Sequence, residues 1–335
     1  MDCNSYPECI LFPIHFKIGL RQSNKLYFFK VGTIIIELSL TFPFKILCFS
    51  APVDDTILVV DESRPTTLVV WNIAKSTVKS EYEFNDKIER IQCSKNFCAI
   101  ITKTVTVIVK INPFSIYQKI KTNEPFQCFA ISNVDINHCI VAYPDEEKPN
   151  SVVILTTPSS DEPVIVNAHK NNVSCLELSN DGQYLVTASV YGTIIRLWDT
   201  KNGNFIEESR RGWTSASIIH FSFSPSSTYL CITSNHGTTH ICKIDRSSTN
   251  GNWLIPMIPK ADISINLKKD SKHIQSMCFS SFVDDDATSL YCVTNTGQCV
   301  VYEIDILNSS AYMKSCFKLD KLMKLANAKK DNLCQ

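Results

Sequence analysis

The sequence lacks a net charge, closely spaced cysteines and long apolar runs, and each absence argues against a class of protein. Its 33 lysine and arginine residues balance 33 aspartate and glutamate residues, whereas proteins that bind nucleic acid through a broad surface are basic. The 15 cysteines include no Cys-x-x-Cys pair, the spacing that zinc sites usually contain. We therefore expect no nucleic-acid partner, no metal and no cofactor.

The scattered cysteines and the missing targeting segment predict a cytoplasmic protein. Several cysteines lie inside apolar runs, where a free thiol behaves as a small hydrophobic group, and this usage is typical of a reducing cytosol. The first residues, Met1-Asp2-Cys3-Asn4, lack the basic start of a signal peptide. The most apolar stretch, Val31 to Val53, is interrupted by Glu37, Lys45 and two prolines. We therefore expect it not to span a bilayer.

Glycine is also scarce, at 9 residues, so the turns must depend on Asn, Asp, Ser and Pro. Between these turns, short runs rich in β-branched residues recur along the chain. Examples are residues 33–36, 57–60, 68–71, 105–109, 151–155 and 193–198. Runs of this length and spacing, with no long helical periodicity before the C-terminus, predict an all-β fold.

One segment in the middle of the chain has the layout of a WD40 blade. Ala168-His169 is followed by the turn Ser179-Asn180-Asp181-Gly182, a strand ending at Ser189, and the closing dipeptide Trp198-Asp199. At roughly 40–45 residues per blade, the chain length predicts a WD40-like β-propeller of seven blades. We assign residues 1–320 to this single propeller and residues 321–335 to a polar C-terminal tail.

This blade departs from the usual WD40 pattern in its central turn. Tyr191 occupies the position where an Asp usually joins a hydrogen-bond network with His, Ser and Trp. The substitution predicts that His169 and Ser189 lack their structural partner. A second feature is the segment Ser209-Arg210-Arg211-Gly212, in which Arg210 is eleven residues after Asp199. Adjacent side chains on extended backbone point to opposite sides, so the two arginines can serve two separate pockets, one towards each neighbouring blade.

These segments together resemble the PROPPIN family of phosphoinositide-binding propellers, whose hallmark is an F/L-R-R-G motif between two blades. The family's preceding segment, S-x-K-G-T-L-I-R-x-F/W-D, corresponds to residues 189–199, and its following segment, S-x-x-G-T-x-H-I, corresponds to residues 234–241. Ile140-Val141-Ala142-Tyr143-Pro144 is similar to the family's L-A-Y-P segment. Ser209 departs from the expected Phe or Leu. The resemblance covers roughly residues 65–245.

The resemblance implies two pockets for the headgroups of phosphatidylinositol 3-phosphate or the 3,5-bisphosphate. Guanidinium groups offer a planar fork of donors that suits phosphate oxygens, and hydroxyls and imidazoles can complete the site. Carried over by position, the first pocket would use His169, Ser189, Thr193, Arg196 and Arg210. The second would use Arg211, Ser234, Thr238 and His240.

An apolar segment downstream predicts a further membrane contact. Residues 251–259 contain Trp253, Leu254, Ile255, Met257 and Ile258 in a region that is otherwise loop-like, and loops normally avoid such a cluster. The loop at this place in PROPPINs inserts into the bilayer. The alternative is that these side chains cover the core of the propeller itself.

We therefore expect a phosphoinositide effector that recruits autophagy or endolysosomal trafficking proteins and is a monomer in solution. It would be recruited peripherally to autophagosomal precursor, endosomal or vacuolar and lysosomal membranes. The alternative is a general WD40 scaffold for protein partners that does not bind lipid. An enzyme is not expected, because the sequence contains no G-x-S-x-G, phosphate-binding loop, H-E-x-x-H or paired nucleophile and base.

Overall fold

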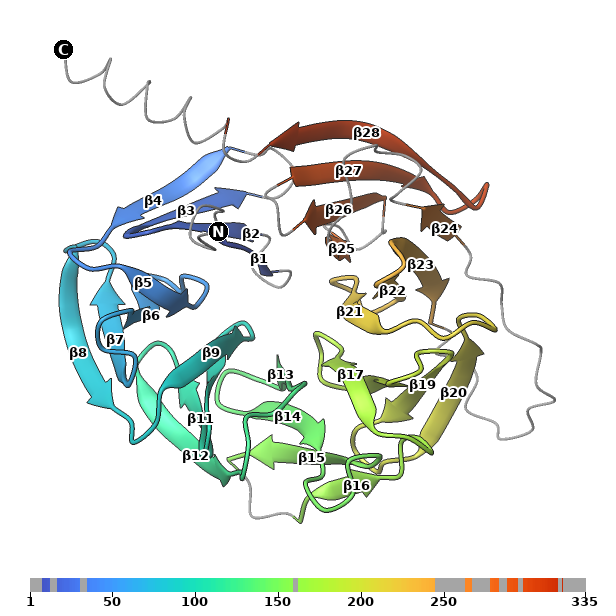
Figure 1. The fold of residues 1–335 in the computed structure, drawn as a ribbon, viewed down its shortest axis with the longest axis horizontal. Helices are drawn as coiled ribbons and strands as arrows, with labels where there is room; N and C mark the ends of the chain where they lie inside the picture. Colours follow the sequence, from blue (N-terminus) through green and yellow to red (C-terminus); the bar gives the residue numbers. More distant parts are fainter. Residues whose placement is uncertain are drawn as a thin grey trace, which may run out of the picture.

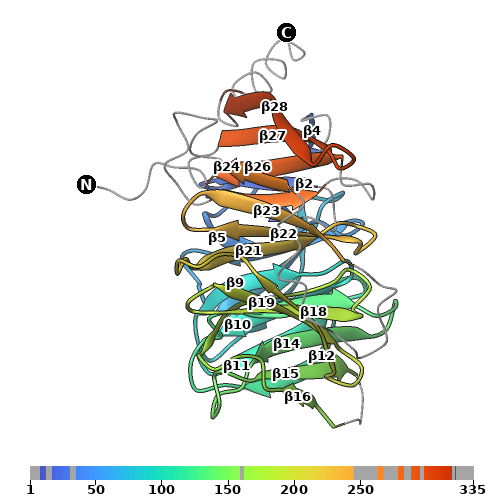
Figure 2. The ribbon, with the colours of Figure 1, turned by 90° about the vertical axis from the view of Figure 1, so that its right-hand side faces the viewer.

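Seven four-stranded antiparallel sheets form a closed ring, which confirms the predicted seven-bladed propeller (Figure 1). The computed structural model describes residues 8–12, 17–30, 35–158, 162–244, 263–266, 278–282, 288–294, 298–318 and 321. Each sheet contains four strands that are consecutive in the chain, so each blade is one continuous segment. The first strand of a blade lies towards the centre of the ring and the fourth at its rim (Figure 1), and the side view shows the blades stacked around the axis (Figure 2).

The blades are numbered along the chain. Blade 1 contains β1 (Glu8–Phe12), β2 (Lys17–Gln22), β3 (Lys25–Lys30) and β4 (Ile36–Thr41), and blade 2 contains β5 (Ile46–Phe49), β6 (Thr56–Asp61), β7 (Thr67–Asn72) and β8 (Thr77–Glu83). Blade 3 contains β9 (Ile88–Cys93), β10 (Phe97–Thr102), β11 (Val105–Lys110) and β12 (Ser115–Lys121), and blade 4 contains β13 (Ala130–Asn133), β14 (Cys139–Pro144), β15 (Val152–Thr157) and β16 (Val164–Val166).

The last three blades follow the same order. Blade 5 contains β17 (Val173–Leu178), β18 (Tyr184–Ser189), β19 (Ile194–Asp199) and β20 (Phe205–Arg210), and blade 6 contains β21 (Ile218–Phe223), β22 (Tyr229–Ser234), β23 (Thr238–Lys243) and β24 (Ile263–Asn266). Blade 7 contains β25 (Cys278–Phe282), β26 (Ser289–Thr294), β27 (Gln298–Asp305) and β28 (Ser310–Lys318). No helix in the described part of the chain is long and apolar enough to cross a membrane.

The middle strands are apolar because each blade is covered on both faces by its neighbours. Every residue of β6 and of β10 is buried, which is why these strands are continuous apolar runs without polar alternation. The outermost strand β8 has one free edge and is mostly exposed. Polar residues that could bind a ligand are therefore confined largely to the strand ends and the rim.

The ring closes between blade 7 and blade 1 through side-chain contacts. Among the described strands, neither blade contains one from the other end of the chain. Blade 1 takes all four of its strands from the N-terminal end of the chain and blade 7 takes all four of its own from the C-terminal part. The two blades meet in one buried cluster to which Leu20 and Phe29 contribute from blade 1, and Tyr291 and Val301 from blade 7. The stability of the closed ring therefore depends on this apolar contact.

We expect Leu20→Ala to lower the free energy of unfolding by about 2–5 kcal/mol, because it leaves a cavity in the contact that closes the ring. Chemical denaturation followed by circular dichroism measures the change. Leu307→Ala is the matched control, since Leu307 is 96% exposed, and its effect should stay within about 0.5 kcal/mol. Equal effects of the two substitutions would contradict this account of ring closure.

Candidate functional site

The Arg210–Arg211 pair lies where two loops meet between blades 5 and 6. One loop is the turn between β18 and β19, and the other connects β20 to β21. The amide N–H of Arg211 donates to the carbonyl oxygen of Thr193 at 2.9 Å, and the amide N–H of Ala216 donates to that of Tyr191 at 3.1 Å. These backbone hydrogen bonds hold the arginine segment against the turn of blade 5.

Glycine is required in that turn for two reasons. Gly192 has a φ of +56°, in the left-handed region that other residues rarely adopt. A Cβ at this position would also lie 2.0 Å from the carbonyl oxygen of Ala216. The close approach of the two loops, and with it the position of the arginines, therefore depends on Gly192.

The two arginines lie on opposite sides of blade 5. In the ladder between β19 and β20, Glu208 is directly opposite Arg196, and Arg210 lies two residues further along the same face. That face also carries Trp198, which packs into the core between blades 4 and 5. Arg210 therefore extends from the side that faces blade 4, and Arg211, the next residue, extends from the other side.

His169 has a structural partner, so the prediction that it lacks one is wrong. Its Nε2 lies 3.0 Å from the hydroxyl of Thr187, and the indole N–H of Trp198 donates to the same oxygen at 3.0 Å. This network forms although Tyr191 replaces the usual Asp. Burial, together with the nearby Arg196 guanidinium, lowers the pKa of His169 to about 4. The imidazole is therefore neutral at pH 7.

The hydroxyls of Ser189 and Thr193, by contrast, have no competing side-chain interaction with any described residue. Ser189 lies on the same face of β18 as Thr187, and its hydroxyl has no hydrogen-bond partner among the residues that the structure describes. Thr193 is half-buried at the start of β19 and contributes its carbonyl oxygen to the contact with Arg211. Both hydroxyls lie at the end of the blade that carries the arginines.

Arg196 is held by the protein itself, in an arrangement that the sequence analysis missed. One terminal nitrogen donates to the carbonyl oxygen of Ala168 at 2.7 Å. Nε and the other terminal nitrogen contact the carboxylate of Glu208 at 2.9 and 2.8 Å. None of the sequence motifs gives Glu208 a role. Its place opposite Arg196 depends on the hairpin register, which residue spacing alone does not define.

Arg210 differs from Arg196 because its guanidinium donates no hydrogen bond to the protein within the described ranges. The carbon atom of the guanidinium lies 4.6 Å from the centroid of the Trp213 ring, at a distance typical of a cation–π contact. Its N–H groups therefore remain available to a ligand.

The second predicted set also comes together, in the interface between blades 5 and 6. His240 is opposite Ile232 in the ladder of β22 and β23, and Ile232 packs into the core shared with blade 5. Thr238 lies on the same face two residues earlier, and its hydroxyl is 2.8 Å from that of Ser234. Burial and the nearby Arg211 guanidinium lower the pKa of His240, which places Arg211 beside this set.

Arg211 is positioned by two backbone carbonyl groups. Its Nε donates to the carbonyl oxygen of Gly192 at 2.7 Å, and one terminal nitrogen donates to that of Thr214 at 2.6 Å. Burial lowers the pKa of Arg211, but the guanidinium stays charged because its ordinary pKa is above 12. A fixed cation thus lies beside the hydroxyls and the imidazole of blade 6.

The remaining predicted site lies outside the described residues. Trp253, Leu254, Ile255, Met257 and Ile258 belong to the segment between β23 and β24, of which the structure describes nothing between residues 245 and 262. Their predicted insertion into a bilayer stays a prediction.

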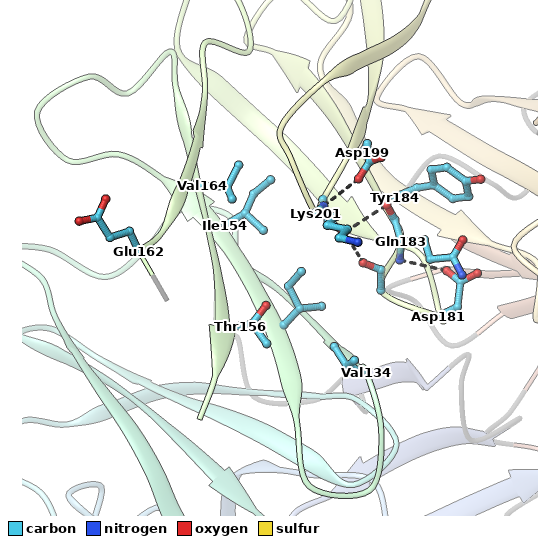
Figure 3. A pocket seen from close by; sticks show the side chains of 13 residues that line it. Val134, Ile154, Thr156, Glu162, Val164, Asp181, Gln183, Tyr184, Asp199 and Lys201 are labelled. Carbon is cyan, nitrogen blue, oxygen red and sulfur yellow. Dashed lines mark hydrogen bonds between the residues drawn. The ribbon is translucent and has the colours of Figure 1, made fainter. Parts of the chain in front are cut away.

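Residues of blades 4 and 5 line a pocket (Figure 3). It is lined from blade 5 by the loop between β17 and β18 and the loop between β19 and β20, including Gln183 and Lys201. Successive loops of an up-and-down sheet alternate between its two ends, so this pocket is separate from the loops that carry Arg210 and Arg211. None of the predicted headgroup residues lines it.

A model of the PROPPIN family matches residues 48–257, which is more than half of the chain. The chain belongs to the PROPPIN family. This result confirms the resemblance inferred from the sequence segments around the two arginines. The matched region includes blades 3, 4 and 5 entirely and every headgroup residue predicted from the PROPPIN pattern.

Curated relatives and solved structures agree with this family. Autophagy-related protein 18 of Dictyostelium discoideum is 31% identical over 185 residues, which cover 55% of this chain and 49% of that protein. The Komagataella pastoris protein of the same name is 26% identical over 264 residues, covering 68% of this chain and 48% of that protein. The chain thus spans about half the length of the curated relatives it matches.

The propeller fold of the PROPPINs is shared at lower sequence identity. Kluyveromyces lactis Hsv2 with a complete loop 6CD superposes with a TM-score of 0.78 at 18% identity, covering 94% of this chain and all of that one. KlAtg21, solved in complex with the coiled coil of AgAtg16, superposes with a TM-score of 0.66 at 16% identity, covering 93% and 99%. At these identities the similarity establishes the fold.

The neutral His169 predicts a stability that depends on pH. The unfolded chain binds a proton at the ordinary histidine pKa near 6.5, whereas folded His169 binds it only near pH 4. The free energy of unfolding should therefore fall as the pH is lowered from about 6.5 towards 4, by up to about 1.4 kcal/mol per pH unit for this residue. In His169→Gln this contribution is absent, so urea denaturation between pH 7 and 5 should show a shallower slope. Equal slopes would contradict a neutral His169.

Proposed function

We propose that this PROPPIN is a phosphoinositide effector that binds phosphatidylinositol 3-phosphate, the 3,5-bisphosphate or both on membranes. The observation that carries the proposal is the separation of two adjacent arginines onto opposite sides of blade 5. Each arginine lies beside side chains of a different set, and both sets come from strand ends on one end of the propeller. This arrangement supports two headgroup sites around one RRG segment.

In the first site, Arg210 would supply the phosphate-binding donors. Its N–H groups have no protein acceptor in the described part of the structure, and the unpaired hydroxyl of Ser189 lies on the same side of the blade. Arg196 would add a second cation once a phosphate competes with Glu208 for its donors. We propose that His169 contributes indirectly, because its Nε2 is already bound to Thr187.

In the second site, Arg211 would bind phosphate together with the hydroxyls of Ser234 and Thr238 and the imidazole of His240. The two backbone carbonyls that hold Arg211 reduce the number of conformations that it must lose on binding. Ser234 and Thr238 already contact each other, so this hydroxyl pair is also preorganised.

Local charge favours recognition by fit over general attraction to anionic lipid. From Arg196 to Arg211 the chain carries four basic and three acidic residues, a net charge of one. Each basic residue near a bilayer contributes about 1 kcal/mol of attraction to anionic lipid, so a net charge of one is a weak general attraction. Binding should thus require the specific headgroup.

Membrane recruitment would bring protein partners with it. The curated relatives are autophagy-related proteins, and KlAtg21 has been solved with the coiled coil of AgAtg16. We propose that this chain likewise recruits autophagy or endolysosomal proteins to the surface of their membranes. Insertion of the loop between β23 and β24 would add apolar contact, at roughly 1.5–3 kcal/mol for each large side chain that becomes fully buried.

We expect the Arg210→Thr/Arg211→Thr variant to lose binding to vesicles that contain phosphatidylinositol 3-phosphate or the 3,5-bisphosphate. Removal of two charged donors costs about 1.5–3 kcal/mol for each hydrogen bond lost, so the affinity should fall at least a hundredfold. Vesicle flotation measures it, with phosphatidylserine vesicles of equal charge as the lipid control. Arg210→Thr alone removes no side-chain hydrogen bond within the described structure, only the exposed contact with the Trp213 ring, so this variant should fold like the wild-type protein.

Arg64→Thr is the matched protein control for this experiment. Arg64 is an exposed arginine of blade 2 that contacts Glu81 at 2.9 Å, and its replacement should leave flotation unchanged. If the wild-type protein ignores both phosphoinositides, or if the double variant floats equally well, the lipid proposal is wrong. The alternative of a protein scaffold without lipid binding would then apply.

Glu208→Gln should strengthen binding to the same vesicles about fivefold at low salt. The substitution removes the carboxylate that occupies Arg196 and raises the local charge by one, which corresponds to about 1 kcal/mol. Glu207→Gln is the matched control, because it changes the charge equally from the other side of β20 and leaves the Arg196–Glu208 contact in place. Glu208→Gln should therefore gain more affinity than Glu207→Gln. Weaker binding of Glu208→Gln would show that the carboxylate instead holds Arg196 in its binding position.

A further inference from the structure

Trp213 is a large aromatic side chain that the proposed headgroup sites do not use, and it is 82% exposed. Among the exposed aromatic residues of the described structure, it exposes the largest fraction of its surface. Tyr191, in the turn that faces this loop, is 52% exposed. Exposure of an indole to water is unfavourable, and Trp213 belongs to no apolar core cluster among the residues that the structure describes. A binding partner would cover it.

The loop that carries Trp213 is held in place by hydrogen bonds on both sides of the indole. Arg211 donates to the carbonyl oxygen of Thr214 at 2.6 Å, and the hydroxyl of Ser215 donates to that of Tyr191 at 3.2 Å. The backbone of Ala216 donates to the same carbonyl at 3.1 Å. The indole is therefore presented on a loop tied to the turn of blade 5.

The contact between Trp213 and Arg210 is compatible with phosphate binding. The guanidinium carbon of Arg210 lies over the indole ring, 4.6 Å from its centroid. Guanidinium N–H groups lie in the plane of the group and point outwards from its edge. One arginine can therefore stack on the ring and bind phosphate oxygens at the same time.

We infer that Trp213, with Tyr191 in the turn bonded to its loop, contacts the headgroup layer of the bilayer when Arg210 and Arg211 bind phosphoinositide. The inference rests on the proposed function. Trp213 is three residues from Arg210, at most about 10 Å along the chain, and the headgroup layer is roughly 5–8 Å thick on each side of a bilayer. Tryptophan and tyrosine prefer this layer, because each combines an apolar ring with a polar group.

A protein partner is the competing occupant, since tryptophan and arginine are also common at the centres of protein interfaces. The position of the arginines favours the bilayer. A phosphate bound by Arg210 brings the membrane surface to the loop that carries Trp213, and a protein that covered the indole would have to occupy the same space. The experiment distinguishes the two occupants.

Tryptophan fluorescence tests the contact directly. The chain has 4 tryptophans, of which Trp71 and Trp198 are buried, and Trp253→Phe removes the one outside the described residues. Vesicles of phosphatidylcholine with phosphatidylinositol 3-phosphate should shift the emission of the Trp253→Phe protein to shorter wavelength. Phosphatidylcholine brominated near the headgroup should quench it. The Trp213→Phe/Trp253→Phe protein should show neither change.

Two affinities separate bilayer contact from headgroup recognition. Trp213→Ala should weaken binding to the phosphoinositide vesicles about tenfold, because the bilayer contact is lost. Its affinity for the soluble headgroup inositol 1,3-bisphosphate should change less than threefold, because no bilayer is present. Tyr312→Ala is the control, since Tyr312 is an exposed aromatic residue of blade 7, and it should alter neither affinity.

The outcomes distinguish this inference from the proposed function. If the wild-type protein binds the vesicles but Trp213 emission is unchanged and Trp213→Ala binds as tightly, the bilayer contact is overturned and headgroup binding stands. Equal losses for vesicles and for the soluble headgroup would also overturn it, because Trp213 would then act only by holding Arg210. If the wild-type protein binds neither the vesicles nor the headgroup, the proposed function fails and this inference fails with it.

Discussion

Each blade of this propeller packs between two others, and this constraint decides which residues are left to bind a ligand. Both faces of the middle strands pack against neighbouring blades, and every residue of β6 and β10 is accordingly buried. Charged side chains therefore lie mainly at strand ends, on the rim and in loops, whereas polar groups between the blades, such as those of Thr187 and Thr233, are buried. The RRG segment occupies such a place, at the end of the rim strand β20 and the start of the connection to blade 6. Its location follows from the architecture before any ligand is considered.

The arginines of the candidate site differ in how the protein holds them. Arg196 and Arg211 are fixed by backbone carbonyls, which lowers the entropy that binding must overcome. Arg210 keeps its donors available, and its guanidinium carbon lies over the ring of Trp213. In the proposed site Glu208 would oppose binding, because a phosphate would have to displace it from Arg196. A site that pairs preorganised cations with one competing carboxylate favours a ligand of high local charge over a diffuse anionic surface.

Residue patterns were sufficient to predict the fold and the family. The WD40 layout of residues 168–199 predicted the propeller, and the motif around Arg210 and Arg211 predicted the family. The prediction failed at His169, because the hydroxyl of Thr187 completes its network without the usual Asp. The pattern Leu185-Val186-Thr187-Ala188-Ser189 contains that hydroxyl, but only the pairing of β18 with β19 brings it to Trp198. Glu208 was missed for the same reason, since hairpin register decides which side chains are opposed.

The sequence by itself determined the seven-bladed fold, the family and the presence of two adjacent arginines on extended backbone. These features follow from local periodicity and from motifs in short segments of the chain. Both can be recognised without knowledge of distant contacts. The tertiary structure alone decided that Gly192 must pass close to Ala216, that Glu208 occupies Arg196 and that Trp213 is left exposed beside Arg210. Each of these features depends on how two strands or two loops pack against each other. Packing and register are properties of pairs of segments, so the sequence of one segment does not define them.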